Sequence, residues 1–212
     1  TLTAAGTVEG LSRTVGQSII AVAGGADFSD GIYADGNTLN FQGSSGTING
    51  DIRGRGNIQN YSGMTFNGTV TPNSPTDFAI CDYPSYLAIA NNVVNKNKTF
   101  TSGNTYSGIW YVNGSVTIQK NVTINGSIIA TGGITISGTN NNRATNINIT
   151  PGSNYPALVA GTNITSSYLQ TSAIKGLIYA RNNVAFDNNK AGTLFNGSIL
   201  AGSNISMKQG SG

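Results

Sequence analysis

The side chains best suited to acid–base catalysis in this 212-residue sequence are eight carboxylates, because the chain contains no histidine. Cleavage of a polysaccharide needs two carboxylates at a defined separation, or a metal ion beside a Lys or Arg base. The carboxylates are scattered, and only Asp187 falls within the most regular part of the sequence, after residue 108. The sequence therefore predicts a chain that is not an enzyme, with no catalytic residue, no cofactor and no metal.

Three aspartates near the N-terminus lie at a spacing that suggests a calcium-binding loop. Asp27, Asp30 and Asp35 alternate with Gly31 and Gly36. Their spacing matches no EF-hand, and the terminal glutamate of that loop is missing. Asp-Gly turns explain the pattern more simply, so we expect no calcium site here.

Basic and aromatic side chains are the remaining candidates for binding chemistry. Arg53 and Arg55 would point the same way from one strand, and Lys96 and Lys98 form a second such pair. A basic stripe would bind phosphates without sequence specificity, and aromatic rings would stack on bases or sugars. Solvated cations and core-lining rings are the simpler interpretation, since the net charge is only +3. The candidate polyanion or glycan contacts are Arg53, Arg55, Lys96, Lys98, Lys120, Arg143, Lys175, Arg181, Trp110 and Tyr111.

The composition predicts the kind of element that must position these groups. Only 9% of the residues are charged, against about 25% in a typical domain, so 29 Gly and 28 Asn supply much of the polar surface. Strong helix formers are few, whereas Ile, Val, Thr, Tyr and Phe suit strands. The single cysteine, Cys81, permits no internal disulfide and fits a small core residue. The sequence therefore predicts an all-β chain.

A repeated phrase predicts the architecture. Each copy has a short apolar strand, a corner rich in Gly and Asn, and a second short strand. Equivalent apolar residues are separated by 30, 20 and 21 positions, and they are Ile128, Leu158, Ile178 and Ile199. A period of about 20 residues is typical of one coil in a solenoid whose coils bury a shared core by stacking. We therefore predict a right-handed parallel β-helix.

Asn-Gly pairs are predicted to form the corners of the coils, because both residues tolerate positive φ. These pairs lie at 49–50, 67–68, 113–114, 125–126 and 196–197. An antiparallel barrel built of Asn-Gly hairpins is the alternative. It requires strict inside–outside alternation, which residues 127–130 and 176–179 follow poorly.

The chain is expected to divide into a short lead-in and one solenoid. Residues 1–23 are predicted to form a lead-in hairpin that joins an absent N-terminal anchor to the solenoid at 24–212. Coils are expected to be irregular over 24–107 and regular over 108–208. The lead-in would cap one end of the solenoid, and the short tail after Met207 would leave the other end open.

One segment departs from the repeat. Pro84 is followed by an apolar run with helical spacing, so we expect a short α-helix near 84–94 that packs against the side or end of the solenoid.

The order of these parts resembles the PilX-like group of type IV pilus-associated proteins, which are minor-pilin-like proteins with a β-solenoid ectodomain. The likeness rests on a segment at 6–15, Asn/Gly-rich coils, the helix beginning near Asp82, the stretch Gly108-Ile-Trp-Tyr-Val-Asn-Gly114, and the later repeats. It implies an exported chain on a pilus or cell surface, with other pilus subunits or surface components as partners. It also implies a membrane contact only through an N-terminal helix, and it implies no catalytic residues.

Two functions follow from these observations. The leading hypothesis is a non-catalytic extracellular scaffold or adhesin on a pilus, and the alternative is a solenoid wall that binds DNA during uptake, or surface glycans. A polysaccharide-active enzyme is a distant third. Ice binding by a solenoid requires a flat array of regularly repeated threonines, and the Thr-x-Thr pairs at 1–3, 69–71 and 99–101 do not recur at the coil spacing. The sequence therefore disfavours ice binding.

Overall fold

The structure is a computed structural model of the chain, and the residues that it describes are 22–23, 31–36, 38–42, 46–59, 64–74, 78, 80–138, 141–189 and 193–209. The predicted lead-in at 1–23 therefore lies outside the described residues, apart from Val22 and Ala23. Two of the three aspartates of the calcium pattern, Asp27 and Asp30, also lie outside them.

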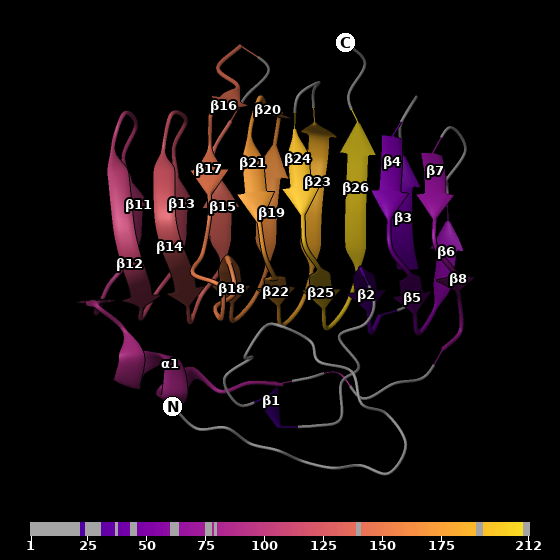
Figure 1. The fold of residues 1–212 in the computed structure, drawn as a ribbon, viewed down its shortest axis with the longest axis horizontal. Coiled ribbons are helices and arrows are strands. Elements are labelled where there is room, and N and C mark those ends of the chain that lie inside the picture. Colours follow the sequence, from indigo (N-terminus) through magenta and orange to yellow (C-terminus); the bar gives the residue numbers. More distant parts are fainter. Residues whose placement is uncertain are drawn as a thin grey trace.

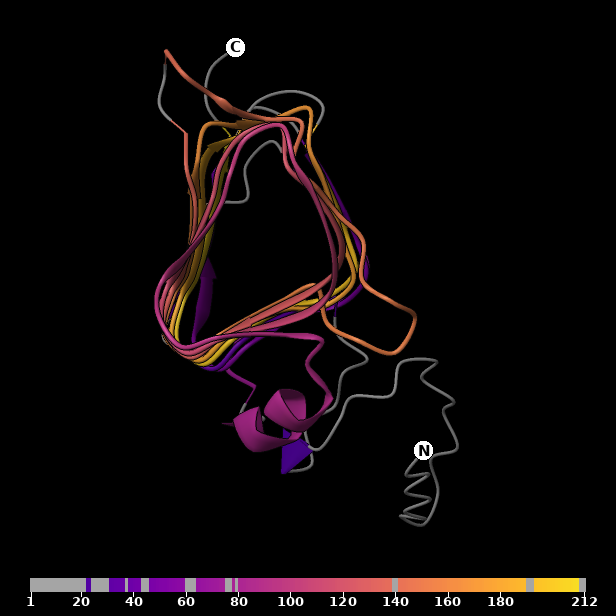
Figure 2. The same ribbon diagram turned by 90° about the vertical axis from the view of Figure 1, so that its left-hand side faces the viewer.

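The chain winds into a parallel β-helix, as the sequence predicts. Coils stack side by side along one axis (Figure 1), and their outline is triangular when seen down that axis (Figure 2). Successive coils nearly superpose along each side of the triangle. Almost every strand pairs with its neighbours in parallel, which excludes the antiparallel barrel.

One side of the triangle is an eight-stranded sheet. In spatial order its strands are β11 (Lys98–Phe100), β13 (Val116–Ile118), β15 (Ile134–Ile136), β19 (Ile164–Ser167), β23 (Val184–Asn189), β26 (Ile205–Gln209), β3 (Thr38–Gln42) and β6 (Asn57–Gln59).

The other two sides share a twelve-stranded sheet, because the long strands β12 (Thr105–Val112) and β14 (Thr123–Ala130) continue through a corner. The second side adds β10 (Asn92–Val94), β18 (Leu158–Ala160), β22 (Ile178–Ala180), β25 (Ile199–Ala201), β2 (Ile32–Ala34), β5 (Ile52–Gly54) and β8 (Val70–Thr71). The third side adds β17 (Asn148–Ile149), β21 (Ala173–Lys175) and β24 (Leu194–Asn196).

Three further pairs of strands complete the elements. Two pairs are parallel: β4 (Gly46–Asn49) with β7 (Met64–Asn67), and β16 (Ala144–Thr145) with β20 (Leu169–Gln170). The third pair is antiparallel and joins β1 (Val22–Ala23) to β9 (Ile80–Cys81).

Stacked aliphatic residues fill the interior of the triangle. The repeat positions Ile128, Leu158, Ile178 and Ile199 are Cα partners in neighbouring coils, as their spacing predicts. Each is at most 3% exposed, and a fully buried Ile stabilises a fold by roughly 1.5–3 kcal/mol. The same column continues in the N-terminal coils with Ile32 and Ile52.

The order of the coils in space differs from their order in the chain. Strand β2 pairs with β25, and β3 pairs with β26, so the N-terminal coils stack on the C-terminal ones (Figure 1). The chain then leaves the N-terminal coils and returns along the second side to start again at β10, at the far end of the stack. The expectation of an open end after Met207 was therefore wrong, because β26 is paired on both edges.

The returning segment includes α1 (Tyr83–Ile89), which begins as predicted but ends earlier than residue 94. Asp82 caps its start, since its carboxylate accepts hydrogen bonds from the backbone N–H and the hydroxyl of Ser85. The helix ends because Ala90 is extended and the N–H of Asn91 donates to Ile109 O, which brings the chain into β10.

The second side of the triangle, which we call the covered face, lies under this returning segment (Figure 2). Its outward row is apolar and packs against Tyr86 of α1 and against Phe78. The Phe78 ring stacks on Tyr179 with centroids 5.3 Å apart. The outward row consists of Tyr111, Ile129, Val159, Tyr179, Leu200 and Tyr33, each at most 9% exposed.

Glycine stacks make the sharp corner between the third side and the covered face. A Cβ at Gly126 would overlap the Gly108 carbonyl of the next coil, and one at Gly197 would overlap the Gly176 carbonyl. Four glycines of the predicted Asn-Gly corners, Gly50, Gly114, Gly126 and Gly197, have positive φ.

Within the described residues, no helix is long and apolar enough to cross a membrane.

Candidate functional site: a threonine rank on the eight-stranded sheet

One threonine from each of four adjacent strands forms a straight row on the outer surface of the eight-stranded sheet. Thr99, Thr117, Thr135 and Thr165 are successive Cα partners across β11, β13, β15 and β19. We call this row the threonine rank. The hydroxyls of Thr165 and Thr135 are 3.4 Å apart and hydrogen-bonded. Adjacent strands are about 4.8 Å apart, so the rank repeats one chemical group at a fixed interval.

The alternation of each strand positions these threonines. In β13 and β15 the threonine lies between two core residues, as in Val116-Thr117-Ile118. The flanking residues are fully or almost fully buried, and successive side chains of a strand point to opposite faces. The threonine is therefore held outward by the packing of both neighbours.

An asparagine ladder fixes the register of the coils that contain β19, β23 and β26, at the corner where these strands begin. The Asn163 side-chain oxygen accepts from the backbone and side-chain nitrogens of Asn183 at 3.1 and 3.0 Å. Asn183 holds Asn204 in the same way, and Asn204 accepts from the N–H of Thr38. The ladder thus joins the C-terminal coils to the N-terminal coil stacked upon them.

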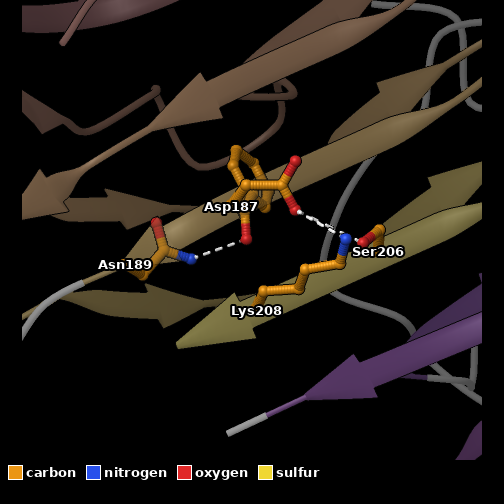
Figure 3. Close-up of polar contacts among 5 residues, drawn as sticks. Asp187, Asn189, Ser206 and Lys208 are labelled. Carbon is orange, nitrogen blue, oxygen red and sulfur yellow. Dashed lines mark hydrogen bonds and ion pairs between the residues drawn. The ribbon is translucent and has the colours of Figure 1, made fainter. Parts of the chain in front are cut away.

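Beyond Thr165 the row continues with Ala185, Ser206, Asn40 and Gln59. The whole outer surface of this sheet, which we call the threonine face, carries little charge. Among the described strand residues that face outward here, Asp187 and Lys208 are the charged ones, and they form an ion pair at 3.9 Å (Figure 3).

Among the described strand residues, the other two faces carry no such regular array. The covered face lies under α1 and the segment around it. The third side has one outward row of Thr105, Thr123, Asn148, Ala173 and Leu194, in which the residue type changes along the row. Leu194 is 53% exposed in this row.

The predicted basic residues do not gather into one stripe. Arg53 lies on β5 of the covered-face sheet, whereas Lys175 is exposed on the third side. Arg55, Lys96 and Arg181 all lie at the corner that leads into the threonine face, but in coils separated by others. Arg55 forms an ion pair with Asp35 at 3.5 Å.

Two further cations make local polar contacts. The Lys120 ammonium donates to the Asn142 side chain at 2.8 Å, and Arg143 donates to the Gln170 side chain at 2.9 Å. These contacts fasten the polar insert after β15 to neighbouring coils. Whether any of the predicted cations contacts a ligand stays a prediction.

The predicted aromatic residues lie inside the protein or under the helix. Trp110 lines the core of the first coil and meets Phe100 and Tyr106 edge to face. The Lys98 ammonium lies 5.1 Å from the Trp110 ring centroid, at an inward position of β11. Tyr111 lies on the covered face and is 9% exposed. Trp110 thus packs against the core and Tyr111 packs under the helix, and whether either ring contacts a ligand stays a prediction.

Two groups at the covered face, Cys81 and Tyr179, have raised pKa values. Burial raises the pKa of Cys81 to about 12, with the Asp82 carboxylate adding to the shift. Burial also raises the pKa of Tyr179 to about 12. In the described part of the chain, no group of three or more His, Cys, Asp or Glu side chains could hold a metal ion.

Solved structures with the same fold include two ice-binding proteins. An ice-binding protein of the Antarctic ascomycete Antarctomyces psychrotrophicus is 17% identical, with a TM-score of 0.59 over 87% of this chain and 96% of that one. A glycosylated ice-binding protein, LeIBP, from an Arctic yeast is 13% identical, with a TM-score of 0.50 over 93% of both chains. No protein-family model matches the sequence, and no curated protein matches it.

These comparisons correct the resemblance to PilX-like pilus proteins, because the similar structures are ice-binding proteins and not pilins. The pilus scaffold and the alternative of a DNA- or glycan-binding wall are corrected with it. The resemblance relied on an order of parts, and two of these parts, the Asn/Gly-rich coils and the later repeats, are ones that any β-helix can use for its corners and core. The comparisons agree with the prediction that the chain is not an enzyme.

The Thr-x-Thr pattern did not predict the threonine rank. The structure uses one threonine per strand, and Thr99 is the only member of the rank that belongs to such a pair. Thr117, Thr135 and Thr165 were visible as the central residues of Val-Thr-Ile, Ile-Thr-Ile and Ile-Thr-Ser, at one place in the repeated phrase. That recurrence was the available signal.

Proposed function

We propose that this chain binds ice through the threonine face. The observation that carries the proposal is the threonine rank, in which four identical side chains from four adjacent strands lie in register. This proposal replaces the pilus scaffold and reverses the earlier argument against ice binding.

The chemistry of the rank suits a crystalline water surface. Each threonine offers a methyl group, around which water forms ordered cages, and a hydroxyl group, which anchors that water by hydrogen bonds. Residues repeat at about 4.8 Å across strands and at about 6.6–6.8 Å between same-face neighbours along a strand. The rank itself is one row at the first of these intervals, because each of the four strands contributes one threonine.

Rigidity of the face supports the same function. A surface that orders water must keep its geometry, and neighbours of Thr117 and Thr135 are locked into the core. The in-register parallel pairing of β11, β13, β15 and β19 has no irregularity among the described residues. The comparisons support the proposal further, because two structures with this fold belong to proteins described as ice-binding.

The proposed function carries an expectation about location. Ice grows first in the medium around cells, so a chain that binds ice acts there. We therefore propose that the chain is exported and works outside the cell.

Thermal hysteresis tests the proposal with two matched variants. Thr135→Tyr places a bulky ring in the middle of the rank, so the face no longer fits a flat ice surface. Thr123→Tyr makes the same change on the third side, in the same coil of the β-helix. We expect the wild type to depress the freezing point below the melting point, and Thr135→Tyr to reduce this gap by at least about five-fold. Equal activity of the two variants, with unchanged thermal unfolding, would refute the assignment of this face.

A further inference from the structure

The charged pair on the threonine face lies within the surface and not at its border. Asp187 lies on β23, the strand next to β19, and Lys208 lies on β26, the strand after that. Their side chains are 36% and 41% exposed. The Asp187 carboxylate also accepts a hydrogen bond from the Ser206 hydroxyl at 3.4 Å (Figure 3), which turns that hydroxyl toward a protein partner.

The backbone becomes irregular at the same place. The register of β23 against β26 shifts between Phe186 and Asn189, and Asn188 adopts a left-handed conformation with φ of 54°. The side chain of Asn189 donates to the carbonyl of Phe186 at 3.0 Å (Figure 3). This is the only register shift among the described pairings of the eight-stranded sheet, and it has the character of a β-bulge.

The side-chain chemistry of the row changes here as well. The partner of Thr165 in the next coil is Ala185, which has no hydroxyl. Charged groups hold their own hydration shells, whose geometry differs from that of ice, and stripping those shells is costly. Charge, backbone irregularity and the loss of the threonine hydroxyl therefore coincide between β19 and β26.

We infer that ice contact is confined to the four-stranded half of the threonine face formed by β11, β13, β15 and β19, and that the Asp187–Lys208 pair sets its limit. This inference rests on the proposed function and narrows it from a whole face to half of one. It makes Asp187 and Lys208 residues that determine the extent of the contact, although neither belongs to the rank.

A pair of tyrosine variants tests the extent of the contact. Thr117 lies on the second strand from one end of the sheet and Asn40 on the second strand from the other end, in the same outward row. We expect Thr117→Tyr to lower thermal hysteresis by at least about five-fold and Asn40→Tyr to leave it within about 1.5-fold of wild type. Melting temperatures of both variants show that each remains folded.

A pair of charge-neutralised variants tests whether the Asp187–Lys208 pair limits the extent of the ice contact. The double variant Asp187→Asn/Lys208→Gln removes both charges and keeps side chains of similar size. Asp35→Asn/Arg55→Gln does the same to an ion pair at a corner, away from the outward rows of the threonine face. The half-exposed Asp187–Lys208 pair is expected to add only about 0–1 kcal/mol to stability. Asp35 is 18% exposed, but an asparagine there can still accept the hydrogen bond of the Tyr33 hydroxyl, so both proteins are expected to fold. We expect the first variant to raise thermal hysteresis by about two-fold and the second to leave it unchanged.

Failure of the inference differs from failure of the proposed function. Equal loss in the two tyrosine variants, or no gain from the Asp187→Asn/Lys208→Gln variant beyond that of its control, would overturn the inference alone. A folded wild-type chain without thermal hysteresis would overturn the proposed function and the inference with it.

Discussion

Single residues on the outermost strand show how the end of the solenoid is protected. Lys98 occupies an inward position on β11, where the next coils have Val116 and Ile134. Its ammonium lies within 5.7 Å of the ring centroids of Phe100, Tyr106 and Trp110. A charge that points inward on an edge strand resists pairing with a second chain, and cation–π contact offsets its partial burial.

The variant Lys98→Met tests this role. It keeps the length of the side chain but removes the charge, so we expect a loss of stability of about 0.5–1 kcal/mol, together with self-association at high concentration. Lys96→Met is the control, because Lys96 is exposed at the adjacent corner. Thermal unfolding and light scattering measure the two effects. If both variants have the same stability and the same light scattering, Lys98 neither stabilises the ring cluster nor prevents association at the edge strand.

Residue types predicted the site only in part. The absence of histidine and the scattered carboxylates predicted a chain that is not an enzyme, and the solved structures compared above are of proteins described as ice-binding. The rank of threonines was not recognised, since a single outward residue per strand has no local signature until the register of neighbouring coils is known. Trp110 has a similar ambiguity, because its inward position follows from pairing with Ile128 and not from its own neighbours in sequence.

At the scale of elements, the segment around α1 is fastened to the covered face by aromatic residues. Phe78 stacks between Tyr33 and Tyr179, and the N–H of Cys81 donates to the Tyr179 hydroxyl. Sequence reasoning found the start of α1 from Pro84 but extended the helix to residue 94. Apolar spacing at Val93 and Val94 fits a strand equally well, and pairing of β10 with β12 decides between the two.

Alkaline conditions are expected to weaken this packing. The pKa of Tyr179 rises on folding from 10.0 to about 12 and that of Cys81 from 9.0 to about 12. A pKa raised on folding stabilises the native state fully below the unfolded value, and that stabilisation is lost as the pH rises toward the folded value. The free energy of unfolding should therefore be constant from neutral pH to about pH 9 and fall between about pH 9 and 12.

Urea unfolding across this pH range measures the effect, and Tyr179→Phe is the matched variant. It keeps the ring that stacks on Phe78 but removes one titrating hydroxyl, so its stability should fall less steeply above pH 10. Parallel pH profiles for wild type and variant would show that Tyr179 does not contribute.

At the scale of the whole molecule, the fold closes by stacking its first coils on its last. The joint is formed by β2 on β25 and β3 on β26. The repeat spacing predicted the coils themselves, since Ile128, Leu158, Ile178 and Ile199 are stacked as expected. The repeat spacing did not predict the order of the coils in space, because the strand edges of all coils are similar and any two coils can stack. The motif Ile-Tyr-Ala occurs at both 32–34 and 178–180, yet only the tertiary structure shows that β25 lies between them.

Truncation after Ser198 tests this order of coils. It removes β25 and β26 and leaves the N-terminal coils without the surface on which they stack. We expect loss of the cooperative unfolding transition seen by circular dichroism, since the missing strands are central in both large sheets. Truncation after Gln209 is the control and should unfold like the full chain. A solenoid stacked in simple chain order would lose only a terminal coil and remain folded.

The most direct test of the account is the partition of the purified chain between liquid water and slowly growing ice. The wild type should be enriched in the ice fraction relative to a soluble protein of similar size, and Thr135→Tyr should be excluded from it. Exclusion of the folded wild type from ice, or equal incorporation of the Thr135→Tyr variant, would contradict the claim that the threonine face binds ice.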